Sequence, residues 1–249
     1  MTIGHEDELD ALKHIGAIVA RALRAMLSAI EPGMTTRELD DLGRAALERE
    51  DARPAPELCY GFPGATCISI APEVAHGIPS DRRITAGDLV NVDVSAEKGG
   101  FFADTGASTI VPPIATERSR LCHATREALR CGLAAVRPGR RFNAIGKAVE
   151  RVAKPRGYRV IRNLQSHGVG RSLHEAPGHI PTHYEPLDPR RIENGMVFTV
   201  EPFLSTGTDW AEEDGDGWTL STPPGILTAQ FEHSVVATRS GPIILTQAF

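Results

Sequence analysis

The chain has 249 residues, of which 41% are hydrophobic and 24% charged, and its formal net charge is −5 at pH 7. These values are typical of a globular protein large enough to bury a full core, and they exclude collagen-like, disordered and coiled-coil chains. The acidic balance argues against nucleic acid as a direct ligand. No apolar stretch approaches the roughly 18 residues that a membrane-spanning helix needs, so we expect no membrane contact.

The cysteines and the first residues bear on the compartment. The chain begins without the basic and then apolar segment of a secretory signal. Its four cysteines have no CxxC spacing, which argues against a thiolate metal site. We therefore expect free thiols and a cytoplasmic protein.

The predicted elements follow one order twice. Two amphipathic helices precede strands that each contain an acidic residue, and then two more helices precede two more such strands. A Pro-Gly pair ends the first helix of each set. The expected helices are 8–28, 36–48, 117–134 and 143–152, and the expected strands include 89–94, 196–204 and 228–236.

Short segments also recur along the chain. Residues 29–34 resemble 135–140 at an offset of 106, and residues 84–93 resemble 192–201 at an offset of 108. The repetition predicts a single α+β catalytic domain, residues 1–249, built from pseudo-symmetric halves of about 1–115 and 116–249. The alternative is a coincidental similarity between two α+β halves.

Carboxylates stand where apolar side chains would be expected. Asp93, Glu201 and Glu232 each interrupt a strand that is otherwise apolar or half apolar, and Asp104 lies in the strand after Asp93. A buried carboxylate without a partner costs several kcal/mol, so each acid needs a positive partner. One such acid taken alone is more often a turn or cap residue. Four acids, two from each half, favour one common site.

The spacing of the two aspartates suggests what that partner is. A two-residue turn at Lys98 and Gly99 would place Asp93 directly opposite Asp104, with Cβ atoms about 4.5–5.5 Å apart. A bulge at Gly99 and Gly100 is the alternative, and it would shift this register. Two like charges so close repel unless a cation lies between them, so we predict a divalent metal ion.

Histidine supplies a further donor. His167 is flanked by small residues, and His174 follows it in a segment that lacks the HExxH helix of zinc proteases. Four carboxylates and one imidazole suit two Mn, Fe, Co or Zn ions better than a thiolate site would. Two such ions about 3.5–4 Å apart activate a hydroxide and polarise a carbonyl, which favours metal-dependent hydrolysis.

These residues, in their order and spacing, resemble type I methionine aminopeptidase. The similarity extends from the first helix to Glu232, and the 30 residues between Glu201 and Glu232 leave no room for the helical insert of type II enzymes. We also expect no extra N-terminal domain of the kind that prolidase and aminopeptidase P carry. The segments that carry the resemblance are 76–79, 91–93, 104–105, 167–170, 174–175, 201–202 and 230–233.

The resemblance implies the pita-bread fold and the removal of the initiator methionine when the second residue is small. It implies that two metal ions are held by Asp93, Asp104, His167, Glu201 and Glu232, with Asp93 and Glu232 bridging them. Glu201 would also carry the proton from water to the departing amine. His76 and His174 would contact the substrate and stabilise the oxyanion and the leaving nitrogen. The implied substrates are the N-termini of nascent polypeptides, with the ribosome as a partner and a monomeric enzyme.

The methionine pocket departs from the family pattern. Phe62, Cys67 and Trp218 stand where the family has pocket residues, with ordinary core packing as the alternative. Cys59 and Tyr60 replace a Tyr-His pair, and Leu173 replaces a Phe that would wall the pocket. A dimetal aminopeptidase of shifted specificity is therefore one alternative. A non-enzymatic binding relative is another, although the presence of all five ligands argues against it.

Overall fold

The computed structural model describes residues 1–247, and it confirms the α+β class and the four long helices. Each of these four long helices begins and ends within two residues of its predicted bounds, whereas a further short helix and a 3-10 turn were not predicted. The helices are α1 (Glu6–Ala29), α2 (Thr36–Glu48), α3 (Ala55–Tyr60), α4 (Thr116–Ala135), α5 (Asn143–Ala153) and the 3-10 turn Lys154–Arg156. The strands are β1 (Arg53–Pro54), β2 (Cys67–Ile70), β3 (Glu73–Ala75), β4 (Leu89–Lys98), β5 (Phe101–Ile110), β6 (Arg159–Val160), β7 (Ser166–Gly168), β8 (Glu175–Ile180), β9 (Val197–Val200), β10 (Phe203–Ser205), β11 (Glu212–Glu213), β12 (Leu220–Ser221), β13 (Thr228–Gln230), β14 (His233–Val236) and β15 (Ile243–Ile244).

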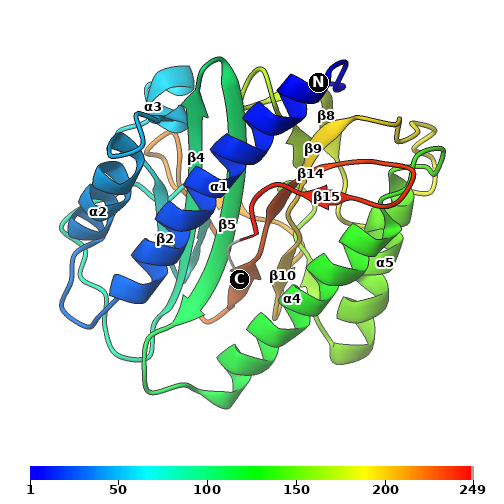
Figure 1. The fold of residues 1–249 in the computed structure, drawn as a ribbon. Helices are drawn as coiled ribbons and strands as arrows, with labels where there is room; N and C mark the ends of the chain where they lie inside the picture. Colours follow the sequence, from blue (N-terminus) through cyan, green and yellow to red (C-terminus); the bar gives the residue numbers. More distant parts are fainter. Residues whose placement is uncertain (248–249) are drawn as a thin grey trace.

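Antiparallel strands form the centre of the molecule, and the long helices cover it from outside (Figure 1). One sheet joins β1, β4 and β2, with β5 on the other edge of β4, and a second has the order β15-β14-β9-β7-β8. Helix α1 packs on β4 and β5, whereas α4 packs on β9, β10 and β13. The order of two long helices followed by strands thus occurs twice. The face of the strands turned away from the helices is left for a site.

The alternation of side chains along β4 explains this division. Val90, Val92 and Val94 are fully buried in the same core cluster as the apolar side of α1. Successive side chains of a strand point to opposite faces, so Asn91 and Asp93 point away from the helix. Burying each valine stabilises the fold by about 1.5–3 kcal/mol, which fixes the polar face of β4 toward the site.

The predicted register of the β4–β5 hairpin is wrong by two residues. Lys98 pairs with Phe101, so Asp93 lies opposite Gly106 and Asp104 lies opposite Ser95. The turn residues are instead Gly99 and Gly100, with φ of 61° and 82°. A type I′ hairpin turn needs positive φ at both central residues, and only a glycine pair meets this without strain. Because the shift is even, both aspartates remain on one face as diagonal neighbours.

Glu201 and Glu232 lie outside the strands that were predicted to contain them. The prediction of continuous strands over 196–204 and 228–236 is wrong, because each is interrupted at its acid. The pairing continues in the same register on both sides of the gap, with Val200 opposite His233 and Phe203 opposite Gln230. This register sets Glu201 opposite Glu232 across the gap.

The gap has a physical cause. Pro202 has no amide hydrogen to donate to a ladder. The amide of Glu232 donates instead to the carbonyl of Gly106, at 2.9 Å, and Phe231 forms an isolated bridge with Ala107. The chain therefore leaves one ladder in order to pair with β5, and this contact joins the two predicted halves at the level of the acids.

The structure also tests the predictions for the cysteines and for membrane-spanning helices. All four cysteines are free thiols, as expected. Within residues 1–247, no helix is long and apolar enough to cross a membrane.

Candidate metal centre and active site

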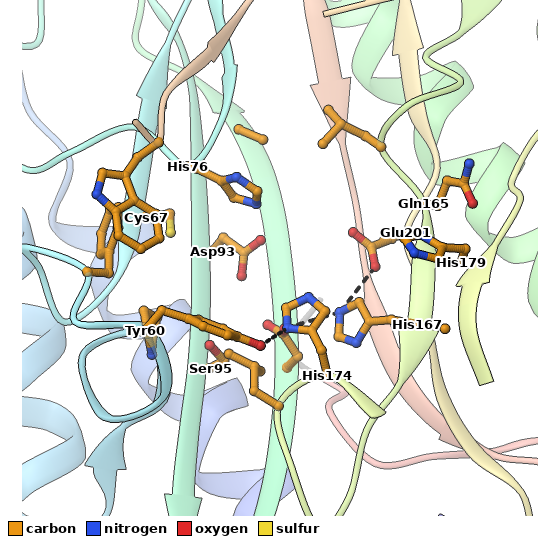
Figure 2. Close-up of a pocket in the computed structure, with 18 of the residues that line it drawn as sticks. Tyr60, Cys67, His76, Asp93, Ser95, Gln165, His167, His174, His179 and Glu201 are labelled. Carbon is orange, nitrogen blue, oxygen red and sulfur yellow. Dashed lines mark hydrogen bonds and ion pairs between the residues drawn. The ribbon is translucent and has the colours of Figure 1, made fainter. Parts of the chain in front are cut away.

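A cavity of about 520 Å³ lies between the two predicted halves and is lined by residues from both. Figure 2 shows the acidic and imidazole side chains gathered on its inner walls. Among the predicted site residues, the lining includes Phe62, Cys67, His76, Asp93, Asp104, His167, His174, Glu201 and Trp218. Glu232 is buried against the same group.

The five predicted metal ligands converge, although 139 positions separate the first from the last. Ligand atoms of Asp104, His167 and Glu232 all lie within 4.8 Å of one another. The Nε2 atom of His167 lies 3.7 Å from Oδ2 of Asp104 and 3.5 Å from Oε1 of Glu201. Asp93 and Asp104 lie close enough for each carboxyl group to affect the pKa of the other. The chain thus brings together every residue that the sequence suggested as a ligand.

Burial makes this concentration of acids unfavourable by itself. It raises the pKa of Asp93 to about 6, and it raises the pKa values of Asp104, Glu201 and Glu232 well above those of ordinary carboxyl groups. The neighbouring carboxylates raise the last three further. Burial, and then the nearby His174, lower the pKa of His167 to about 3, so this imidazole is neutral near pH 7.

Two carboxylate oxygens at the centre have no hydrogen-bond partner among the described residues. They are Oδ1 of Asp104 and Oε1 of Glu232, and both are buried. A buried polar group without a partner costs about 1–3 kcal/mol, and more when it is charged. Oxygen donors, one imidazole and an excess of negative charge fit divalent cations, and these residues can hold them.

Hydroxyl groups orient one side of the centre. Thr199 donates its hydroxyl to Oε1 of Glu201, at 2.7 Å, and accepts the amide of His167, at 3.0 Å. The Ser166 hydroxyl accepts the amide of Glu201, at 3.0 Å. These residues are not among the predicted site residues. Thr199 could have been found as the residue two positions before Glu201, which shares its face of the extended chain.

An amide chain orients the other side. Asn91 donates to the side-chain oxygen of Gln230, at 2.8 Å, and Gln230 donates to Oε2 of Glu232, at 2.9 Å. Gly106 gives this chain its room, because a Cβ there would lie 2.4 Å from the Gln230 side chain. The amide chain thus occupies Oε2 and leaves Oε1 of Glu232 as the oxygen without a hydrogen-bond partner.

Two histidines point into the cavity from different halves (Figure 2). His76 has a φ of 55°, unusual for a residue with a Cβ, and it precedes Gly77. A Cβ on Gly77 would lie 2.2 Å from the carbonyl oxygen of Ile68, so this close packing sets the position of His76. Desolvation lowers the pKa of His76, and it lowers the pKa of His174 to about 4. Both imidazoles are therefore neutral hydrogen-bond donors or acceptors near pH 7.

The predicted pocket residues lie together on the apolar wall. The rings of Phe62 and Trp218 meet edge to face, with centroids 5.2 Å apart. Cys67 pairs with Asp93 across β2 and β4, which places its thiol beside the predicted metal centre. Leu173 also lines the cavity. The two rings pack against one another, and all four residues line the cavity. Their thiol and aromatic rings can contact the thioether of a methionine side chain.

Other residues line the cavity without having been singled out as site residues. Tyr60 contacts His174, and its place in the altered Cys59–Tyr60 pair was a signal that could have identified it. Gln165 and His179 also line the cavity, and the sequence held no signal for either. Cys59 is exposed.

Comparison with known proteins agrees with the geometry. The model of metallopeptidase family M24 matches residues 10–239. The chain is 48% identical over 248 residues to methionine aminopeptidase 2 of Bacillus subtilis, covering 99% of this chain and all of that protein. A methionine aminopeptidase of Staphylococcus epidermidis is 42% identical, with 99% of each chain covered.

Solved structures give the same result. The methionine aminopeptidase of Rickettsia prowazekii superposes with a TM-score of 0.93 at 34% identity, over 99% of this chain and all of the other. The enzyme of Thermotoga maritima gives 0.94 at 33% identity, over 99% of each chain. Prolidase from Pyrococcus furiosus shares the fold, with a TM-score of 0.80 at 23% identity, and the chain covers 65% of it. The pita-bread fold is therefore confirmed, and the chain belongs to metallopeptidase family M24 and, within it, to the methionine aminopeptidases.

Proposed function

We propose that this chain removes the N-terminal methionine from polypeptides by metal-dependent hydrolysis, as one catalytic domain with internally repeated halves. The observation that supports this most strongly is the buried cluster of Asp104, His167 and Glu232 at the floor of a cavity with an apolar wall. Excess negative charge and unpartnered carboxylate oxygens favour cations at the floor. The apolar wall favours an uncharged side chain above it.

The proposed site binds two divalent ions, which are Mn, Fe, Co or Zn, through five side-chain ligands. Asp93, Asp104, His167, Glu201 and Glu232 would hold them. Bound ions would supply a water of lowered pKa and would polarise the scissile carbonyl.

Glu201 is suited to move the proton. One of its oxygens accepts the hydroxyl of Thr199, which leaves the other to take a proton from the attacking water and return it to the departing amine nitrogen. Burial raises the pKa of this carboxyl group, as proton transfer near neutral pH requires. His76 and His174, neutral near pH 7, would donate hydrogen bonds to the developing oxyanion and to the leaving nitrogen.

The apolar wall of Phe62, Cys67 and Trp218 would take the methionine side chain. We propose a preference for a small second residue, and N-termini of nascent polypeptides as the substrates. The enzyme would act in the cytoplasm, as a monomer, with the ribosome as the partner that this substrate class implies. Leu173, in place of an aromatic ring, supports the second candidate, a dimetal aminopeptidase with a different N-terminal preference.

The test is a substrate panel. Metal-free protein is reconstituted in turn with Mn, Co, Fe and Zn and assayed on peptides with Met, Leu or Ala first and with Ala or Leu second. We expect cleavage after Met, faster before Ala than before Leu, and none in chelator. Metal-dependent cleavage after Leu or Ala instead would support the second candidate. Tight binding of two ions without cleavage of any peptide would refute both.

A further inference from the structure

Tyr60 is the last residue of a short helix that ends in a tight turn. Helix α3 is terminated by Gly61, whose φ of 67° closes the turn, and the Gly61 amide donates to the carbonyl of Glu57. The chain therefore reverses directly after Tyr60. This leaves the tyrosine side chain half exposed, at 48%, on the rim of the cavity.

The base of this helix is held from the other side. Both terminal nitrogens of Arg44, in α2, donate hydrogen bonds to the two carboxylate oxygens of Glu57. Ala55 and Pro56 are buried beneath. A bidentate arginine–carboxylate pair has little orientational freedom, so α3 presents Tyr60 from a fixed base.

From this base, Tyr60 reaches the opposite half of the molecule. Its hydroxyl lies 2.7 Å from Nδ1 of His174, and the two ring centroids are 5.6 Å apart (Figure 2). On its other side, the His174 ring lies 3.8 Å, between centroids, from the ring of His167. His174 is thus placed between a tyrosine of one half and a predicted metal ligand of its own half.

This contact sets the chemical form of His174. A neutral imidazole has one nitrogen with a proton and one without, and a hydrogen bond at either nitrogen selects the tautomer. An imidazole nitrogen is a stronger acceptor than a phenol oxygen, which favours the arrangement with the Tyr60 hydroxyl as donor and Nδ1 as acceptor. The proton of His174 then resides on Nε2, where it is available to a substrate.

We propose that Tyr60 is a positioning residue: its hydroxyl holds the His174 ring across the cavity and keeps its Nε2 protonated as a hydrogen-bond donor to the substrate. This proposal rests on the proposed function for its kinetic consequence, but the hydrogen bond itself does not depend on it. The half-exposed tyrosine adds little to the core, so its removal should affect chemistry more than stability.

The first test is Tyr60→Phe, which removes only the hydroxyl. With the metal that supports turnover, we expect kcat on a Met-Ala peptide to fall about 3- to 10-fold, the range of one neutral hydrogen bond, with KM and metal content nearly unchanged. The matched control is Tyr184→Phe. The ring of Tyr184 lies under the amino group of Lys147, away from the cavity, so removing its hydroxyl should leave kcat unchanged.

A double-mutant cycle separates positioning from direct contact. If Tyr60 acts through His174, then Tyr60→Phe has no further effect in a His174→Gln background. An equal loss of kcat in both backgrounds, or a loss that appears only in KM, would overturn the proposal, because Tyr60 would then contact the substrate itself.

A spectroscopic measurement makes the proposal independent of turnover. In metal-free protein with ¹⁵N-labelled histidine, Nδ1 of His174, assigned with the His174→Gln variant, should show the shift of an unprotonated, hydrogen-bonded nitrogen. Tyr60→Phe should move this signal and mix the two tautomers. If wild-type protein cleaves no peptide but shows this signal, the proposed function fails and the positioning contact stands. If the signal does not change in Tyr60→Phe, the positioning contact fails.

Discussion

Removing one acid from the metal centre should make the metal-free protein more stable while it removes the function. The substitution is Asp93→Asn, which keeps the shape of the side chain. Burial raises the pKa of Asp93 from 3.8 to about 6, and the charge of Asp93 raises the pKa values of Asp104, Glu201 and Glu232. Near pH 8, at least one buried negative charge therefore destabilises the folded, metal-free protein, because the same group is exposed to water in the unfolded chain.

The magnitude follows from the pKa of Asp93. A change from 3.8 to about 6 corresponds to about 3 kcal/mol at pH values above both, since one pKa unit is 1.36 kcal/mol. Water in the cavity screens part of this, so we expect a gain of about 1–3 kcal/mol. For a chain of this size, that raises the Tm by about 2–12 °C.

The sign depends on pH and on metal. A raised carboxyl pKa means that the folded state binds more protons than the unfolded state between about pH 4 and 6, so stability is present at low pH and is lost as pH rises. The advantage of Asp93→Asn should therefore be absent near pH 4 and full near pH 8. Metal at 100 times its Kd stabilises the wild type by about 2.7 kcal/mol and the variant by much less, which offsets most or all of the variant's advantage.

The assay is thermal unfolding at pH 4, 6 and 8, in chelator and in Mn or Co, with peptide cleavage measured in parallel. The matched control is Asp188→Asn. Asp188 is paired with Arg190, whose hydrogen bond lowers the pKa of Asp188, so this substitution should lower the Tm near pH 8 and leave the metal-induced increase intact. If metal-free Asp93→Asn were less stable than wild type near pH 8 and kept the full metal-induced increase, the charge-repulsion argument would be refuted.

Three further results are expected. His76→Ala should lower kcat while two ions still bind, as measured by elemental analysis; loss of metal in this variant would mean that His76 is a ligand. Gly77→Ala should lower the free energy of unfolding by about 1–3 kcal/mol or more, because the new Cβ would lie 2.2 Å from the carbonyl oxygen of Ile68; Gly178→Ala, with nothing within 4 Å of its Cβ, is the control and should be nearly neutral in thermal unfolding. Metal uptake should release protons and weaken as pH falls from 8 toward 5.5, since the pKa of Asp93 is about 6; calorimetry in two buffers of different ionisation enthalpy measures this, and uptake with no proton release at any pH would contradict it.

The order of elements and the set of candidate metal ligands could be predicted from the chain. Helix periodicity and Pro-Gly stops are local properties, so the bounds of the four long helices were found within two residues. Acids within predicted apolar strands are unfavourable when buried without a partner, and several of them together favour a cation site. For that reason, Asp93, Asp104, Glu201 and Glu232 could be grouped with His167 before any geometry was known.

The register of the strands and the contacts between the halves were decided only by tertiary structure. The β4–β5 turn lies at Gly99 and Gly100, not at the predicted Lys98 and Gly99, because both central residues need positive φ. Glu201 and Glu232 lie outside the predicted strands because the amide of Glu232 donates to the carbonyl of Gly106 in the other half. The contact between Tyr60 and His174 likewise joins positions 114 residues apart. Local sequence specifies which groups a site contains, because side-chain chemistry is local; how they face one another depends on packing between segments that no local pattern encodes.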